Sequence, residues 1–242
     1  MKQRIREGSM KVIKQIGLAL MVALAMAAGP LTYGADDKET TERLAAATDV
    51  LNEIMAAPDK GIPQDLLDKS ACAVIIPNVK KGAFIVGAKY GRGFIACRKA
   101  GGTGWSAPAG VKVEGGSVGL QIGGSETDVI MLVMNQGAIN KLLSSKFTIG
   151  GDASAAAGPV GRTSSAETDA QLHAEILTYS RTRGLFAGVS LQGATLRPDD
   201  DANKDMYGKK MSNQDIVGSA KEPAAASGLI AALNKHSGKR AR

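Results

Sequence analysis

The sequence predicts an α+β domain with a strongly curved or barrel-like, mainly antiparallel, glycine-rich sheet, flanked by an N-terminal amphipathic helix and short helices. Short β-rich runs follow one another at spacings too close for crossover helices, which favours antiparallel pairing. Thirty glycines against eight prolines and 4% aromatic residues indicate many turns and close backbone approaches. One amphipathic helical pattern precedes these runs.

The composition is that of a chain able to form a core. Its 242 residues are 44% hydrophobic and 22% charged, unlike the compositions of disordered chains. The formal net charge is +7, but residues 1–34 carry +4 and the tail from Lys235 carries another +4, which leaves −1 for the body. Because no strongly basic domain remains, the charge does not predict a nucleic-acid partner.

Residues 1–35 are predicted to be an export signal peptide. A basic stretch precedes the apolar run 16–28, which Gly29 and Pro30 end. The run is shorter than the roughly 20 apolar residues that a membrane-spanning helix needs, so a cleaved signal is favoured over an uncleaved anchor. We expect cleavage near Ala35, which would place the mature protein in the periplasm or outer cell envelope.

The first predicted element of the mature chain is an amphipathic helix over 40–57, whose apolar residues share one stripe. Its polar face is mixed rather than basic, which favours packing on its own domain, with a helix lying on a membrane surface as the alternative. A short helix follows over 63–69, with Pro63 in its first turn.

Strands are then predicted in six short runs separated by glycines. The runs are 71–76, 83–90, 94–99, 111–114, 117–122 and 128–134. The glycines between 90 and 94 are interpreted as a hairpin turn.

The remaining elements are a helix, a second hairpin and a terminal helical segment. They are predicted over 136–146, over 174–181 with 185–196, and over 199–207. The domain is expected to cover 36–218, and the Ala/Pro/Ser/Gly-rich, basic segment 219–242 is predicted to be a flexible tail.

Two cysteines, Cys72 and Cys97, are candidates for a disulfide. An exported location permits the bridge. Both lie in apolar runs, where two buried small side chains are the alternative.

Six glycine-containing motifs occur in order along the chain. The first three are Lys89-Tyr90-Gly91-x-Gly93-Phe94, Gly104-Trp105-Ser106-x-Pro108 and Gly116-Ser117-x-Gly119-x-Gln121-x-Gly123. The others are Gly158-Pro159-x-Gly161-Arg162, Tyr179-Ser180-x-x-x-Gly184-Leu185-Phe186-Ala187-Gly188 and Asn203-x-x-x-Tyr207-Gly208. In these motifs, over roughly 45–218, the chain resembles the SYLF domain family, also called the YSC-type actin-patch domain.

This resemblance implies a non-enzymatic module that binds membrane lipids, with phosphoinositides the class bound by eukaryotic members, some of which also bind actin filaments. A single domain behind an export signal argues against actin and favours an anionic phospholipid or membrane surface of a bacterial envelope. A structural scaffold that binds an envelope protein partner is the alternative function, and an unrecognised hydrolase is a third.

The candidate lipid-binding residues are cations near the predicted hairpin turns, because clustered cations can receive phosphate head groups. They are Lys80, Lys81, Arg92, Arg98 and Lys99. Solvated turn charges are the alternative interpretation. Trp105, in a glycine-bounded loop, is a candidate for contact with a membrane interface, and burial as a structural anchor is favoured over that contact.

No catalytic residue, metal site or cofactor is predicted. The G-x-G-x-x-A string at 91–96 is not followed by the helix that a dinucleotide-binding turn requires. The alternating Asp/Asn residues of 199–205 are not followed by the turn glycine and the glutamate of a calcium loop. His173 lies among acidic residues and is interpreted as a surface histidine rather than a base.

Overall fold

The computed structural model describes residues 33–57, 61–83, 86–118, 123–144, 146–161, 173–182, 185–189 and 191–241. The chain divides into two compact units, Met1–Asp36 and Asp37–Arg242. The predicted export signal at 1–35 lies outside the described residues, apart from its last three positions, which belong to the first helix.

The described helices are α2 (Tyr33–Ala56), α3 (Gln64–Lys69), α4 (Gln136–Leu142), α6 (Asp200–Tyr207), α7 (Asn213–Ser219), the 3-10 helix η1 (Ala224–Ala226) and α8 (Ser227–His236). Four of them, α2, α3, α4 and α6, agree with the predicted ones in position and order, whereas α7, η1 and α8 were not predicted. Asp199 caps α6 by accepting from the Ala202 amide, and Gly208 ends the helix in the left-handed conformation. The aspartates from 199 onward thus begin a helix, as the sequence indicated.

The described strands form one sheet of nine. They are β1 (Cys72–Ala83), β2 (Val86–Cys97), β3 (Ala109–Val118), β4 (Gly123–Val133), β5 (Phe147–Thr148), β6 (Ala155–Ala157), β7 (Ile176–Thr182), β8 (Leu185–Gly188) and β9 (Thr195–Pro198). Their order is β5-β9-β3-β2-β1-β4-β7-β6, with β8 also paired to β7. Every pair is antiparallel except β6 with β7. The predicted α+β fold with a curled, mainly antiparallel sheet is confirmed.

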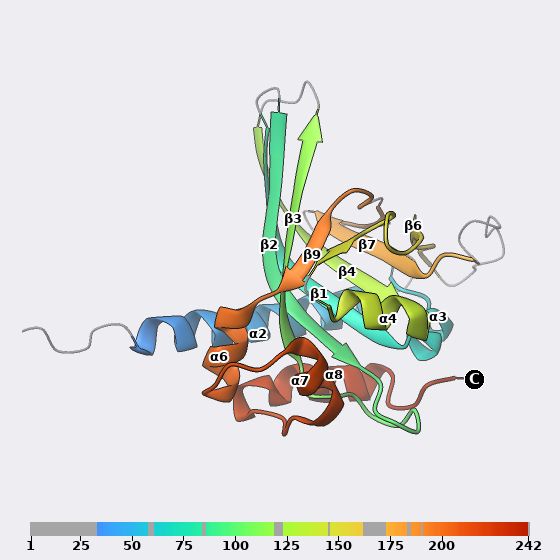
Figure 1. Ribbon diagram of the computed structural model, residues 1–242. Helices are drawn as coiled ribbons and strands as arrows, with labels where there is room; N and C mark the ends of the chain where they lie inside the picture. Colours follow the sequence, from blue (N-terminus) through green and yellow to red (C-terminus); the bar gives the residue numbers. More distant parts are fainter. Residues whose placement is uncertain are drawn as a thin grey trace, which may run out of the picture. The chain divides into compact units, whose positions relative to one another are not determined.

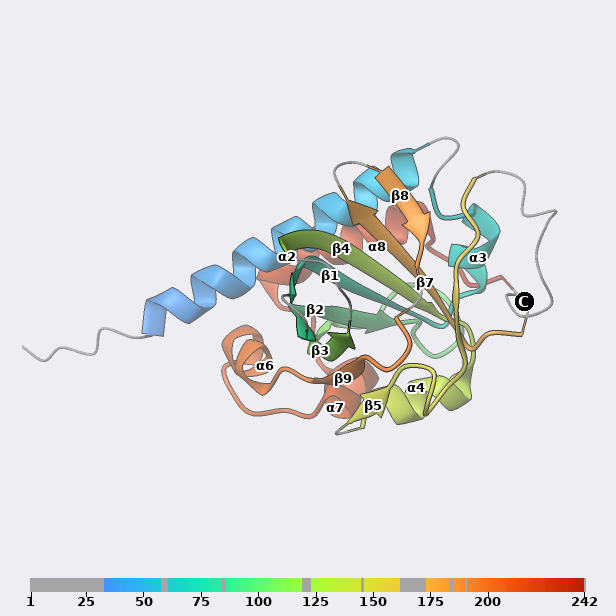
Figure 2. The same cartoon turned by 90° about the horizontal axis from the view of Figure 1, so that it is seen from above.

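The four central strands have the order β3-β2-β1-β4, which is that of a Greek key. Only four residues connect Val118 of β3 to Gly123 of β4, although two strands lie between them in the sheet. A flat sheet would separate the outer strands by about 14 Å, which four residues span only when almost fully extended. Curling of the sheet shortens this path (Figure 2).

Each face of the sheet is covered by its own core, because successive side chains of a strand point to opposite faces. Along β1, Val74 and Ile76 belong to the inner core, which includes residues of α4, α7, β5 and β9. Ala73 and Ile75 belong to the outer core, which α2, α3 and α8 cover. The residues 40–57 thus form the amphipathic helix that packs on its own domain.

Beyond Glu114 of β3 and Thr127 of β4, the described part of the sheet consists of the four central strands alone. We call this extension the arm and define it as residues 80–83, 86–90, 115–118 and 123–126. Figure 1 shows β2 and β3 extending together beyond β9 and the helices.

The hairpin turn predicted between residues 90 and 94 is wrong, because β2 runs through this segment as one strand. Here β1 is irregular: its register shifts around Asn78, which has a φ of 52°. A Cβ atom on Gly93 would lie 2.1 Å from the Ile75 carbonyl oxygen, and one on Gly91 would lie 2.8 Å from Cγ2 of Val79. These glycines permit close approach to β1 rather than a turn.

The flexible tail predicted over 219–242 is also wrong for the residues described there. Helix α8 buries Leu229, Ile230 and Leu233 in the outer core. Nε2 of His236 lies 2.9 Å from Oδ1 of Asn52 in α2, which links the C-terminal helix to the first one.

Candidate functional site

The five candidate cations do not form one cluster. Arg98 and Lys99 follow the last residue of β2, whereas Lys80 and Lys81 lie in the arm at the other end of β1. Arg92 lies between them on β2, six residues before Arg98, which corresponds to about 20 Å along a strand. The structure therefore separates the predicted lipid site into two groups.

Arg92 is not available to a head group, because its charge is already paired. Its Nε and Nη2 donate to the two carboxylate oxygens of Asp199 at 2.5 and 2.9 Å, and its Nη1 lies 3.5 Å from Glu39. The hydrogen bond to Asp199 raises the pKa of Arg92 above its usual value. The residue fastens β2 to the start of α6 and to α2.

Trp105 is completely buried, which contradicts its assignment as a lipid contact and agrees with the structural anchor. Its Nε1 donates to the Ser237 carbonyl at 2.7 Å. The guanidinium carbon of Arg98 lies 4.0 Å from the centre of the Trp105 ring, a cation–π arrangement. The tryptophan thus joins the loop after β2 to the C-terminal segment and supports Arg98.

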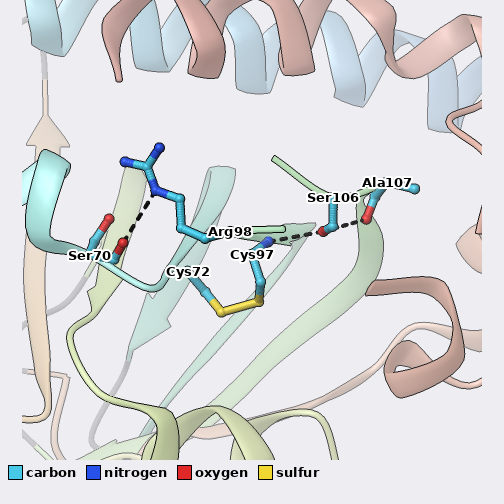
Figure 3. Close-up of a disulfide and its surroundings, with 6 residues drawn as sticks. All are labelled: Ser70, Cys72, Cys97, Arg98, Ser106 and Ala107. Carbon is cyan, nitrogen blue, oxygen red and sulfur yellow. Dashed lines mark hydrogen bonds between the residues drawn. A yellow bond between two sulfur atoms is a disulfide. The ribbon is translucent and has the colours of Figure 1, made fainter. Parts of the chain in front are cut away.

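Cys72 and Cys97, whose pairing the sequence left open, form a disulfide in the structure. They are directly opposite each other at the ends of β1 and β2 (Figure 3). Next to this bridge, the Ser106 hydroxyl accepts from the Cys97 amide at 3.0 Å and donates to the Ala107 carbonyl at 3.0 Å. The loop containing Ser106 is therefore tied to the disulfide-bonded end of the sheet.

Arg98 extends from this end of the sheet over main-chain oxygens (Figure 3). Its Nη1 donates to the Ser237 carbonyl at 2.5 Å, and its Nη2 donates to the Leu67 carbonyl at 3.1 Å and to the Ser237 hydroxyl. Its Nε lies 3.4 Å from the Ser70 carbonyl. All these acceptors are uncharged, so the hydrogen bonds fix the guanidinium without neutralising it.

A cleft of about 620 Å³ opens beside the disulfide, between α4, α7 and the loop after β2. We call it the basic cleft. Its described charged lining residues are Arg98, Lys99 and Arg240, and no described carboxylate lines it. Ile139 and Leu143, on the α4 side, are among its apolar lining residues. The remaining described lining residues are Ala71, Cys97, Ala100, Gly101, Gly102, Ser106, Ala107, Gln136, Asn140, Gln214, Val217, Gly218, Ser219 and Ala220.

Two arginines lie close together at the cleft. Burial lowers the pKa of Arg98 to about 10, an effect that Asp68 opposes and Arg240 adds to. Arg240 also donates to uncharged oxygens, the Lys69 carbonyl at 3.0 Å and the Met134 carbonyl at 3.1 Å. Arg98 therefore remains charged at neutral pH, and a phosphate or carboxylate entering the cleft would meet positive charge beside apolar side chains.

The arm lysines have different surroundings from one another. Lys80 stands between Glu126 of β4 and Tyr90 of β2 in the strand register, so an acidic neighbour accompanies it. Lys81 stands directly opposite Lys89 of β2. Lys80 and Lys81 are adjacent in β1, so their side chains lie on opposite faces of the arm. Of these two lysines, Lys81 is the one whose partner in β2 is another cation.

Sequence reasoning missed Arg240, Ile139 and Leu143 as cleft residues. Arg240 was assigned to the flexible tail, and the apolar pair was assigned to an ordinary helix. The spacing of apolar residues in 136–143 predicts the helix, but only the folded structure shows that this helix lies beside the end of β2.

Within the described ranges, no helix has the length and apolar character required to cross a membrane.

The chain is matched by a family model over residues 114–236, described as Ysc84, Las17-binding protein actin regulator. The match covers half of the chain and runs from Glu114, within β3, to the end of α8. The chain therefore belongs to the Ysc84 (SYLF) family.

Several curated proteins are similar to this chain. It is 38% identical over 177 residues to an SH3 domain-containing protein of Schizosaccharomyces pombe, covering 72% of this chain and 41% of the relative. It is 32% identical over 179 residues to human SH3 domain-containing YSC84-like protein 1, covering 73% and 52%. It is 33% identical over 186 residues to LAS seventeen-binding protein 3 of Saccharomyces cerevisiae, covering 75% and 40%. The chain thus spans about half the length of the curated relatives it matches.

Proposed function

We propose that this chain binds anionic phospholipids without catalysing a reaction, and that the basic cleft is the binding site. The observation that carries the proposal is the lining of the cleft, where three cations and no described carboxylate surround a cavity with apolar side chains. A phospholipid head group presents phosphate oxygens next to apolar chains, and arginine is well suited to phosphate because its donors are fixed in a plane.

The proposed location is a bacterial cell envelope. Its support is the sequence pattern of residues 1–35, a basic stretch followed by a short apolar run. The disulfide between Cys72 and Cys97 is compatible with an oxidising compartment. An exported chain would not meet cytosolic actin, so the actin-related description of the family is not transferred to it.

A protein partner is the second candidate function. Two of the relatives carry the name LAS seventeen-binding protein 3, which supports a protein as a ligand of this family. For this chain the partner would be an envelope protein held by a scaffold. The two candidates differ in their response to lipid charge, because only phospholipid binding requires an anionic vesicle.

The test measures co-sedimentation of the full chain with phosphatidylglycerol-containing and pure phosphatidylcholine vesicles at 0.1 M salt. The cleft variant combines Lys99→Gln with Gln214→Glu, both exposed positions on the cleft lining. A change of two charges at about 1 kcal/mol each should weaken binding to anionic vesicles about ten- to thirty-fold.

The matched control combines Lys210→Gln with Gln192→Glu, two exposed positions that are not among the described lining residues. It changes the net charge equally, but screening over about 10 Å limits its effect to less than about three-fold. Both variants keep residues 1–35, so any membrane affinity of that segment is common to both. Equal binding of neutral and anionic vesicles, or equal losses in the two variants, would refute the cleft as the lipid site.

A further inference from the structure

Two lysines of the arm form a like-charge pair. Lys81 of β1 and Lys89 of β2 are directly opposite each other, and both side chains are half-buried. In the same register, Ser125 of β4 flanks Lys81 and Gly115 of β3 flanks Lys89. This row of four described residues thus holds two positive charges and no carboxylate. Like charges directly opposite each other destabilise a sheet.

Three other cations near the pair each have an acidic neighbour. Arg92 is bonded to Asp199, Lys80 has Glu126 beside it, and Arg197 of β9 lies 3.6 Å from Glu114. Lys112 of β3 lies opposite Arg92 and Arg197, so the carboxylates bonded to these two arginines accompany that row of cations. An anion supplied from outside would relieve the repulsion between Lys81 and Lys89. A phosphate group suits the position because it carries several acceptor oxygens that two ammonium groups can share.

The arm and the basic cleft lie at opposite ends of the same two strands. The β1–β2 register runs from the Cys72–Cys97 pair beside the cleft to the Ala83–Gly87 pair in the arm. Lys89 and Arg98 are nine residues apart, which corresponds to about 30 Å along the strand direction. Figure 1 shows the arm extending away from α4 and α7, the helices that line the cleft.

We propose that Lys81 and Lys89 form a second anion-binding surface and that the protein links two anionic membrane surfaces, one held at the arm and one at the basic cleft. The linking activity rests on the proposed function for the cleft, whereas the arm surface rests on the lysine pair itself. The two sites lie at opposite ends of β1 and β2, about 30 Å apart along the strands, so they can face different membranes.

The test mixes two populations of phosphatidylglycerol-containing vesicles, one carrying a donor dye and the other an acceptor dye, and measures energy transfer on addition of the full chain. Wild-type protein should bring the populations together. The arm variant, Lys81→Gln with Lys89→Gln, should bind vesicles within about three-fold of wild type by co-sedimentation but need at least about ten-fold more protein for clustering, because only one surface remains.

The matched control is Lys209→Gln with Lys210→Gln, which removes two exposed lysines after α6 and should leave clustering unchanged. The arm variant should melt no lower than wild type, since a repulsion has been removed. Clustering by the arm variant at the wild-type protein concentration, or tight binding of wild type without any clustering, would overturn this inference and leave the cleft proposal standing. Failure of wild type to prefer anionic vesicles in co-sedimentation would instead refute the proposed function, and the linking activity with it.

Discussion

Single residues show most clearly where local patterns mislead. Gly91 and Gly93 have the spacing of a turn, and the sequence alone does not indicate the short distance between these glycines and the backbone of β1. Trp105 lies in a glycine-rich loop, yet it is buried in the outer core and donates to the carbonyl of Ser237, 132 positions away. The sequence therefore marks these glycines and this tryptophan as special positions. Their structural roles, close strand packing and burial, depend on contacts between distant segments.

Gly93→Ala should destabilise the domain strongly. The added Cβ would meet main-chain atoms of Ile75 and Ile76 at 2.1 and 2.6 Å, and these atoms are fixed by pairing with both neighbouring strands. We expect a loss of about 1–3 kcal/mol or more in the free energy of unfolding, measured by urea denaturation.

The control for this substitution is Gly116→Ala in β3, where no heavy atom lies within 4 Å of the added Cβ. It should leave the free energy of unfolding unchanged or slightly raised, because alanine restricts the unfolded chain. A neutral result for Gly93→Ala would mean that β1 and β2 separate more easily than their register indicates.

At the scale of elements, helical and strand periodicity predicted most of what the structure contains. The amphipathic stripe of 40–57, the short helix at 63–69 and the capped helix from Asp199 are all present. The C-terminal helices α7, η1 and α8 are not among the predicted elements, because the alanine, proline and glycine around them are typical of a tail. The apolar residues Leu229, Ile230 and Leu233 have the spacing of one face of a helix, and this pattern alone would predict α8.

Leu233→Ala tests whether α8 belongs to the folded domain. The side chain is fully buried, and its truncation should cost about 2–5 kcal/mol of unfolding free energy. Lys235→Ala, at an exposed position of the same helix, should have almost no effect. Equal melting temperatures of both variants and wild type would show that the C-terminal segment does not contribute to the core.

At the scale of the whole molecule, the close spacing of β-rich runs and the many glycines were sufficient to predict the curled antiparallel sheet. The family model also extends to residue 236, past the point where the motifs in the sequence ended. The binding surface was harder to predict. Lys80, Lys81, Arg92, Arg98 and Lys99 were grouped together, but β1 and β2 carry Lys81 and Arg98 to opposite ends of the sheet. The cleft also needs Arg240, which folding brings from the far end of the chain.

The central claim is that anionic phospholipid is held in the basic cleft. Hydrogen–deuterium exchange of the full chain, with phosphatidylglycerol-containing vesicles and with phosphatidylcholine vesicles, tests it most directly. Anionic vesicles should slow exchange in the loop 99–104 and at the cleft-facing helices α4 and α7, and neutral vesicles should not. Unchanged exchange in all three segments under conditions where the protein is bound to anionic vesicles would contradict the account.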